Sequence, residues 1–227
     1  MAYSVFRPRG ARPALMNRAL RSRREWQAAT QAVCKAGLDP HPDAVKNWDH
    51  LAALHYIRSH TDESARVLDA GGLVHSPLVG WLSTCGYTSL HVINLSFEED
   101  FKLGTIQYIR GDCTTTHYPN GFFDIIACLS VIEHGVGIQH FLKESHRILR
   151  PGGSLIISTD YWGHPNAIMP DDGKIFTPEE VQQIVECAIS IGFESTGAID
   201  YETNERTIKW ESEEQSYTFI IFSLMKK

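Results

Sequence analysis

The chain has 227 residues, 43% of them hydrophobic, which is enough for one substantial core in a single domain with an N-terminal extension. Its formal net charge is −6, although residues 1–24 hold seven of the 21 lysines and arginines and no acid. The remaining 14 basic side chains are outnumbered by 27 acidic ones, so we expect no nucleic acid partner, because each neutralised phosphate needs a Lys or Arg. No apolar run approaches the roughly 20 residues of a membrane-spanning helix, so we expect no membrane partner either.

The N-terminal residues and the cysteines bear on location and domain organisation. We expect residues 1–24 to form a solvated basic arm, with an organelle transit segment and a site for an anionic partner as the alternatives. The five cysteines show no CxxC or metal-type spacing, which favours reduced thiols in a cytoplasmic protein. The predicted division is a basic arm at 1–24, N-terminal helices at 25–63 and a main domain at 64–227.

The first predicted elements are helices at 22–37 and 44–59, the second with Asp43 as its N-cap. From residue 65 onward, short apolar runs alternate with helices, a pattern typical of a parallel sheet that is covered on both faces. The last predicted strand has no helix after it, so we expect it to pair antiparallel with its predecessor. Strands are predicted at 65–70, 89–95, 106–110, 123–129, 153–159, 194–200 and 217–225, and helices at 76–85, 137–149 and 177–191, the last with a capping box in "TPEE".

Four stretches follow one another in an order that is more specific than any one of them. They are "VLDAGG" (67–72), "HVINLS" (91–96), "YIRGD" (108–112) with "NGFFDIIACLSVIEHG" (120–135), and "HRILRPGGSLIISTDYW" (146–162). In this order the chain resembles the class I S-adenosylmethionine-dependent methyltransferases from about residue 65 to residue 226. The resemblance implies an α/β fold: a Rossmann-like seven-stranded sheet with an antiparallel last strand, in three αβα layers, here with added N-terminal helices. It also implies S-adenosyl-L-methionine as the cofactor.

The resemblance further implies which residues bind this cofactor, at the carboxyl ends of neighbouring parallel strands. Gly71 and Gly72 let the backbone approach the ligand without a Cβ clash, and Asp69 matches the acidic residue of the family's first motif. Asn94 stands where the family has a carboxylate for the ribose hydroxyls, and Asp112 matches the acceptor for the adenine amino group. The predicted cofactor-binding residues are Asp69, Ala70, Gly71, Gly72, Asn94, Leu95, Asp112, Cys113, Leu129 and Ser130.

The end of the fourth predicted strand and the segment after the fifth are expected to form the acceptor side. Related small-molecule O-methyltransferases with an ExxEH pattern bind a divalent metal there, but Ser130 replaces the first glutamate, so no metal is predicted. The segment "TDYWGHPNAIMPDDGKIF" (159–176) combines proton acceptors with aromatic side chains and resembles the part of the family that covers the acceptor. A hydroxyl acceptor must lose a proton. His164 or Asp160 is predicted to take it, with His134 as the next candidate.

The leading interpretation is a methyltransferase that acts on a small-molecule acceptor, preferably an oxygen of a sugar or another polar metabolite, and it leaves a homo-oligomer open. A second interpretation starts from Leu73 and His75, which stand where such loops often have further glycines, and from the uncharged Asn94. Under it, the domain is a non-catalytic binding or scaffolding module, unless an acid at 98–100 replaces the missing carboxylate. A nicotinamide dehydrogenase is the third interpretation, and the absence of GxGxxG argues against it.

Overall fold

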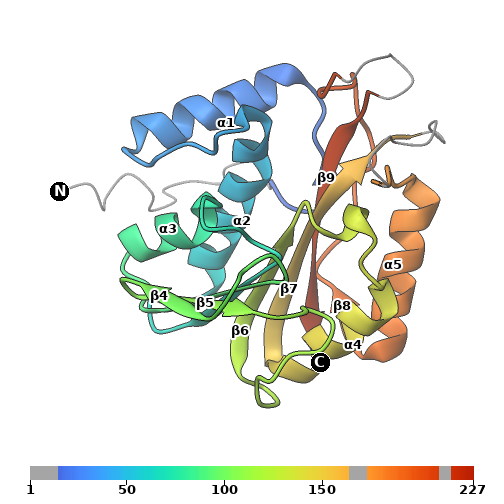
Figure 1. Ribbon diagram of the computed structural model, residues 1–227. Helices are drawn as coiled ribbons and strands as arrows, with labels where there is room; N and C mark the ends of the chain where they lie inside the picture. The colour runs from blue at the N-terminus through green and yellow to red at the C-terminus, as the bar shows by residue number, and fades with distance from the viewer. Residues whose placement is uncertain (1–14, 164–172, 210–215) are drawn as a thin grey trace.

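The structure is a computed structural model that describes residues 15–163, 173–209 and 216–227. One mixed β-sheet with helices on both faces forms its centre (Figure 1). The described strands follow the order β1-β9-β7-β6-β2-β3-β5-β4, and β8 also pairs with β9. The strands are β1 (Arg18–Ala19), β2 (Arg66–Ala70), β3 (Ser89–Asn94), β4 (Phe101–Leu103), β5 (Ile106–Arg110), β6 (Phe123–Leu129), β7 (Leu149–Tyr161), β8 (Phe193–Ser195) and β9 (Thr218–Lys226).

The helices divide between the two faces of the sheet, which confirms the predicted three-layer α/β fold. Helices α1, α2 and α3 pack on one face with their own hydrophobic cluster, and α4 and α5 pack on the other (Figure 1). None of the helices in the described residues is long and apolar enough to cross a membrane. The helices are α1 (Arg23–Lys35), α2 (Asn47–His60), α3 (Pro77–Thr84), α4 (Ile138–Ile148) and α5 (Pro178–Ile191), with 3₁₀ turns η2 (Ala44–Lys46) and η3 (Ile132–His134).

Strands β5, β3, β2, β6 and β7 are parallel, and β9 runs antiparallel to β7. On its other side β9 pairs antiparallel with β8, its predecessor, so the predicted antiparallel last strand is confirmed. The parallel order changes direction around β2, since β3 lies on one side of it and β6 on the other. Ligands of open α/β sheets bind beyond the carboxyl ends of the strands at such a switch point.

Two predicted strands differ from the structure by more than one residue at an end. The helix α4 was expected to stop at "RPGG" before the next strand, but β7 begins at Leu149 and runs through these residues. The register shifts there, because Phe123 pairs with Leu149 whereas Ile125 pairs with Ser154. A Cβ on residue 153 would lie 2.9 Å from the carbonyl oxygen of Arg150, so this bulge requires glycine. At the other edge, the strand expected at 194–200 is shortened to β8.

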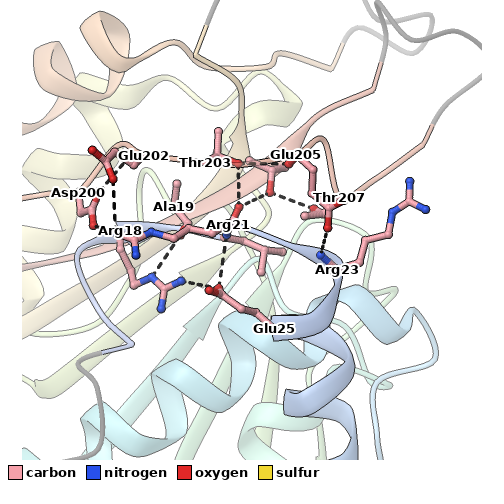
Figure 2. A network of polar contacts seen from close by, with 12 residues as sticks. Arg18, Ala19, Arg21, Arg23, Glu25, Asp200, Glu202, Thr203, Glu205 and Thr207 are labelled. Carbon is pink, nitrogen blue, oxygen red and sulfur yellow. Dashed lines mark hydrogen bonds and ion pairs between the residues drawn. The ribbon is translucent and has the colours of Figure 1, made fainter.

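Part of the predicted N-terminal arm is built into the sheet, because β1 pairs with β9 at Ile220 and Ile221. Three arginines of this region are held by acids in an arrangement that we call the arginine clasp (Figure 2). The guanidinium groups of Arg18 and Arg21 pair with Glu25 and Asp200, and the backbone N–H of Arg23 donates to the side chain of Glu205. The clasp therefore fixes the chain before α1 against residues 200–205, while residues 1–14 lie outside the described part of the chain.

Candidate active site

The carboxyl ends of the parallel strands bring most of the predicted site residues to one edge of the sheet. The hydrogen-bond ladders continue just past the strands, since Gly71 N–H donates to the carbonyl of Ile93 at 2.8 Å and Ser130 N–H donates to that of Ser158 at 3.1 Å. The loops that follow β2, β3, β5 and β6 consequently start side by side. This edge carries Asp69 to Gly72, Asn94, Leu95, Asp112, Cys113, Leu129 and Ser130.

Asp69 is almost fully buried, and its Oδ2 has no hydrogen-bond partner among the described residues. Burial raises the pKa of this carboxyl to about 6, because the charged form loses its hydration. A Cβ on residue 72 would lie only 2.3 Å from Oδ2, so the carboxylate is directly against the backbone of Gly72. A buried oxygen without a partner next to a bare glycine fits the cationic amino group of a bound amino acid moiety, as in S-adenosyl-L-methionine.

Asn94 stabilises the glycine turn. Its Nδ2 donates to the carbonyl oxygens of Gly71 at 2.7 Å and Gly72 at 3.1 Å, and its Oδ1 accepts the N–H of Ser96. A carboxylate at position 94 could not donate these two bonds, which gives the departure from the family pattern a structural reason. The ribose contact predicted for Asn94 stays a prediction, and in this arrangement only Oδ1 has capacity left for it.

The side chains that replace glycines in the loop lie on the surface. Leu73 and Val74 are exposed, and so is His75, whose ring centroid lies 6.5 Å from that of His41. Leu95, at the end of β3, is 69% exposed, an unusual amount for a large apolar side chain. These side chains are therefore not packed into the core, and Leu95 offers an exposed apolar surface directly after β3.

Asp112 and Cys113 follow β5. The Oδ1 of Asp112 accepts the N–H of Thr114 at 2.7 Å, which closes a local turn, and the side chain is exposed. Burial raises the pKa of the Cys113 thiol to about 11, so this side chain is a neutral thiol at physiological pH. The adenine contact predicted for Asp112 stays a prediction.

Two buried carboxyls, Glu133 and Asp160, lie in the two segments that were predicted to form the acceptor side. Burial first, and then the neighbouring Asp160, raise the pKa of Glu133 well above its ordinary value; Thr159 Oγ1 donates to its Oε2 at 3.0 Å. Burial also raises the pKa of Asp160 to about 7, against the opposing effects of Lys46 and a hydrogen bond from Tyr217. Both carboxyls therefore keep their protons to a higher pH than ordinary acids do.

Ser130, predicted to bind the cofactor, and His134, predicted as a catalytic candidate, flank Glu133 in the sequence. Ser130 adopts a left-handed conformation with φ 52°, rare for a residue other than glycine, and its Oγ is buried without a described partner. Burial lowers the pKa of His134, which favours the neutral ring. His164 lies outside the described residues. No group of three or more His, Cys, Asp or Glu side chains that could hold a metal ion is found in the described part of the chain.

The 41–50 segment, which leads into and begins α2, reaches the same edge of the sheet and was not predicted to belong to the site. The Oδ2 of Asp49 accepts the hydroxyl of Ser158 at 2.6 Å. Lys46 acts electrostatically on both Glu133 and Asp160, so its ammonium group is part of the same environment. A signal was present in "KNWDH" (46–50), because four polar residues gather at the start of an apolar helix. The contact with β7, however, has no local signature.

Comparison with known proteins gives matches of limited length in sequence and extensive matches in fold. A family model described as a methyltransferase domain matches residues 87–157. Phosphoethanolamine N-methyltransferase 1 of Arabidopsis thaliana is 32% identical over 78 residues, which cover 34% of this chain and 16% of that protein. Phosphoethanolamine N-methyltransferase 3 of the same plant is 30% identical over 84 residues, or 37% of this chain and 17% of that protein. The matched segment is thus a small part of either relative.

Solved structures resemble the chain over most of its length. A Mesorhizobium loti S-adenosylmethionine-dependent methyltransferase has a TM-score of 0.55 at 16% identity and covers 81% of this chain and 99% of its own. Phosphoethanolamine N-methyltransferase 2 of Haemonchus contortus, in complex with S-adenosyl-L-methionine, has a TM-score of 0.57 at 15% identity, over 78% of this chain and 52% of its own. The [4+2]-cyclase SpnF has a TM-score of 0.64 at 15% identity, over 93% and 98%. At these identities the likeness shows the fold, and together with the family model it confirms the resemblance drawn from the sequence.

Proposed function

We propose that this chain, which has the class I methyltransferase fold, transfers a methyl group from S-adenosyl-L-methionine to a small-molecule acceptor. The proposal also starts from the segment that matches a methyltransferase family model. The observation that carries the proposal is the buried Oδ2 of Asp69 against Gly72, which has no hydrogen-bond partner in the described part of the chain. Such an oxygen is costly in a protein without a ligand, and a cationic amino group would satisfy it. The cofactor-bound neighbours with this fold support the same ligand.

The residues at the carboxyl-end edge of the sheet bind S-adenosyl-L-methionine at its two ends. Asp69, Gly71 and Gly72 hold the amino acid end, and Leu95 with Asp112 lies where the adenine and ribose are proposed to bind. S-adenosyl-L-methionine supplies the methyl group on a cationic sulfur atom. Ser130 and Leu129 form the floor under it, and the residues of the chain mainly hold the acceptor in line with the methyl carbon and exclude water.

For the acceptor, we propose an oxygen of a sugar or of another polar metabolite. The support is Asp160, whose pKa of about 7 suits a group that hydrogen-bonds an acceptor hydroxyl. An amine is the competing acceptor, because the relatives from Arabidopsis thaliana are named as N-methyltransferases. The predicted cytoplasmic location, the absence of a nucleic acid partner and the open question of a homo-oligomer stay predictions.

Titration calorimetry with S-adenosylhomocysteine tests the cofactor proposal. The wild-type chain is expected to bind in the micromolar range, and Gly72→Ala should weaken binding at least about tenfold because the new methyl group collides with Asp69. The matched control is Gly80→Ala, since a Cβ at this helical position meets no atom within 4 Å. A folded wild-type chain that binds nothing at millimolar ligand would instead support the non-catalytic module.

The acceptor itself can be found with S-adenosyl-L-methionine that carries a trideuterated methyl group. The protein is incubated with this donor and a small-molecule extract, and mass spectrometry identifies compounds that gain the labelled methyl group. Fragmentation then shows whether the label is on oxygen or nitrogen. Label on oxygen is the expected result, and label on nitrogen would overturn the proposed acceptor class.

A further inference from the structure

Asp49 and His50 form a buried pair at the start of α2. The Nδ1 of His50 lies 2.9 Å from Asp49 Oδ1 and 2.8 Å from the carbonyl oxygen of Lys46. The backbone N–H of His50 also donates to Asp49 Oδ1, at 2.8 Å. Asp49 is completely buried and the His50 side chain nearly so, so both groups are held in one geometry by contacts that water does not disturb.

The partners of Nδ1 determine which nitrogen of His50 carries a proton in the neutral ring. A backbone carbonyl can only accept a hydrogen bond, so Nδ1 must be the donor to Lys46 and Asp49. The Nε2 on the opposite side of the ring then has a free lone pair. No hydrogen bond to Nε2 is found in residues 15–163, 173–209 and 216–227. A carboxylate that fixes a histidine in this tautomer is the arrangement by which enzymes prepare an imidazole to accept a proton.

The pair is connected to the floor of the candidate site. The second oxygen of Asp49 accepts the hydroxyl of Ser158, and the same hydroxyl accepts the backbone N–H of Ser130 at 3.1 Å. The strained Ser130 turn and the His50 ring thus depend on one carboxylate. Burial alone would raise the pKa of Asp49, but His50, Ser158 and Lys46 together lower it, so Asp49 is ionised at neutral pH.

Electrostatic interactions connect the Asp49–His50 pair with both buried carboxyls of the candidate site. His50 acts on Asp69 at the end of β2, and Asp49 acts on both Asp69 and Asp160. The ring of His41 lies 5.1 Å away and that of Trp81, from α3, 6.3 Å away. The charged or titratable groups around His50 are therefore Asp49 and Lys46 on its own segment, His41 before it, and Asp69 from the sheet.

We propose that His50 is a catalytic residue of this site, which accepts the proton of a hydroxyl acceptor at Nε2, and that Asp49 is the positioning residue that orients it. The inference rests on the proposed methyltransferase function. In the step, a bond forms between the acceptor oxygen and the methyl carbon, the methyl carbon–sulfur bond breaks, and the hydroxyl proton goes to Nε2. The sulfonium charge disappears as the imidazolium charge appears, so the charge balances. Asp160, held by Tyr217, hydrogen-bonds the acceptor in this arrangement.

A test that needs no acceptor is nuclear magnetic resonance of the ¹⁵N-histidine-labelled protein, with His50 assigned by its loss in His50→Asn. Long-range proton–nitrogen correlations should show His50 with the proton on Nδ1. Addition of S-adenosylhomocysteine should shift the His50 Nε2 and Hε1 resonances and leave those of His60 unchanged, because His60 lies at the far end of α2. A proton on Nε2, or resonances that saturating ligand does not move, would overturn the proposal.

The variant His50→Asn separates proton transfer from structure. Its amide can still donate near the position of Nδ1, but it has no basic nitrogen in place of Nε2. With the acceptor found by methyl labelling, kcat is expected to fall by roughly 10²–10⁴-fold, while the dissociation constant of S-adenosylhomocysteine changes less than about threefold. The matched control His60→Gln should keep wild-type turnover.

The two proposals fail in different ways. If the wild-type chain does not bind S-adenosylhomocysteine, the proposed function is contradicted, and the resonance shifts of His50 are then absent as well. If the wild-type chain binds this ligand and the His50→Asn variant keeps full turnover, only the inference about His50 is contradicted. Asp49→Asn supplies the readout for positioning, because it should lower kcat and broaden the His50 tautomer signals without abolishing ligand binding.

Discussion

Two of the polar contacts between the N-terminal part of the chain and its C-terminal half differ in burial. At the Asp49–Ser158 contact the carboxylate and the neighbouring imidazole are 0% and 5% exposed. In the arginine clasp, the side chains of Arg21 and Asp200 are 37% and 40% exposed. Charges in water lose little when they separate, whereas buried charges depend on every partner. The difference indicates that the clasp holds two segments together, while the buried contact adjusts the geometry of a site.

Removal of the buried carboxylate is expected to have the largest effect on stability. Asp49→Ala leaves the Ser158 hydroxyl and the His50 ring without their partner, which should lower the free energy of unfolding at pH 7 by about 3 kcal/mol. The folded-state pKa of Asp49 is lowered, so its contribution is present above the pKa of the unfolded chain and disappears as the pH falls. Urea denaturation at pH 7 and pH 3.5 measures both statements.

Ser158→Ala is the matched control for this prediction, since it deletes one neutral hydrogen-bonding group from the same contact. It should lower the free energy of unfolding by about 1 kcal/mol. An Asp49→Ala chain that unfolds no more easily than Ser158→Ala would show that the buried charge contributes nothing, and the contrast with the clasp would disappear.

A buried carboxylate without a partner should behave in the opposite way. The pKa of Asp69 is raised to about 6 in the folded chain. The free energy of unfolding is therefore higher when this carboxyl is protonated, and it falls as the pH rises from the pKa of the unfolded chain through this value. Asp69→Asn should therefore stabilise the unliganded protein by about 1–3 kcal/mol at pH 8 and leave it nearly unchanged at pH 4. The same variant should bind S-adenosylhomocysteine more weakly. Thermal unfolding across this pH range and calorimetry measure the two effects, and a stability difference that does not vary with pH would contradict the argument.

The smallest effect is expected in the arginine clasp. Arg21→Ala should lower the free energy of unfolding by less than about 1 kcal/mol, because its ion pairs are partly exposed. The loss should shrink further in 1 M salt, which screens exposed charges. The exposed Arg24, for which no ion pair is found among the described residues, provides the control as Arg24→Ala. A salt-independent loss of several kcal/mol from Arg21→Ala would show that the clasp behaves like the buried contact.

Most of the parallel sheet could be predicted from the sequence because β2, β3 and β6 are largely buried and read as nearly continuous apolar runs. The predicted runs at 106–110 and 123–129 coincide with β5 and β6, and the capping box at Thr177 is present. Strands β1 and β4 have two and three residues, too few for any periodicity. The bulge at Gly153 also escaped prediction, because "PGG" ordinarily ends an element and here lies within one.

Local contacts of the candidate site were easier to predict from the sequence than contacts between distant residues. Asp69 and Gly72 are close in the chain and share a local turn, so one motif finds both. Asp49 and Ser158 are 109 residues apart, and nothing in either neighbourhood indicates the other. The same holds for Asn94, whose amide stabilises a loop more than 20 residues away; a sequence pattern shows the missing charge but not the two hydrogen bonds that replace it.

The position of β9 has a consequence for how the molecule assembles. This strand comes after all the other described elements in the chain, yet it lies between β7 on one side and β1 with β8 on the other. A nascent chain that has emerged only as far as residue 217 would leave the long, buried strand β7 as an open edge, and such edges recruit other strands. Protection of this intermediate against aggregation during synthesis therefore depends on how soon residues 218–226 follow.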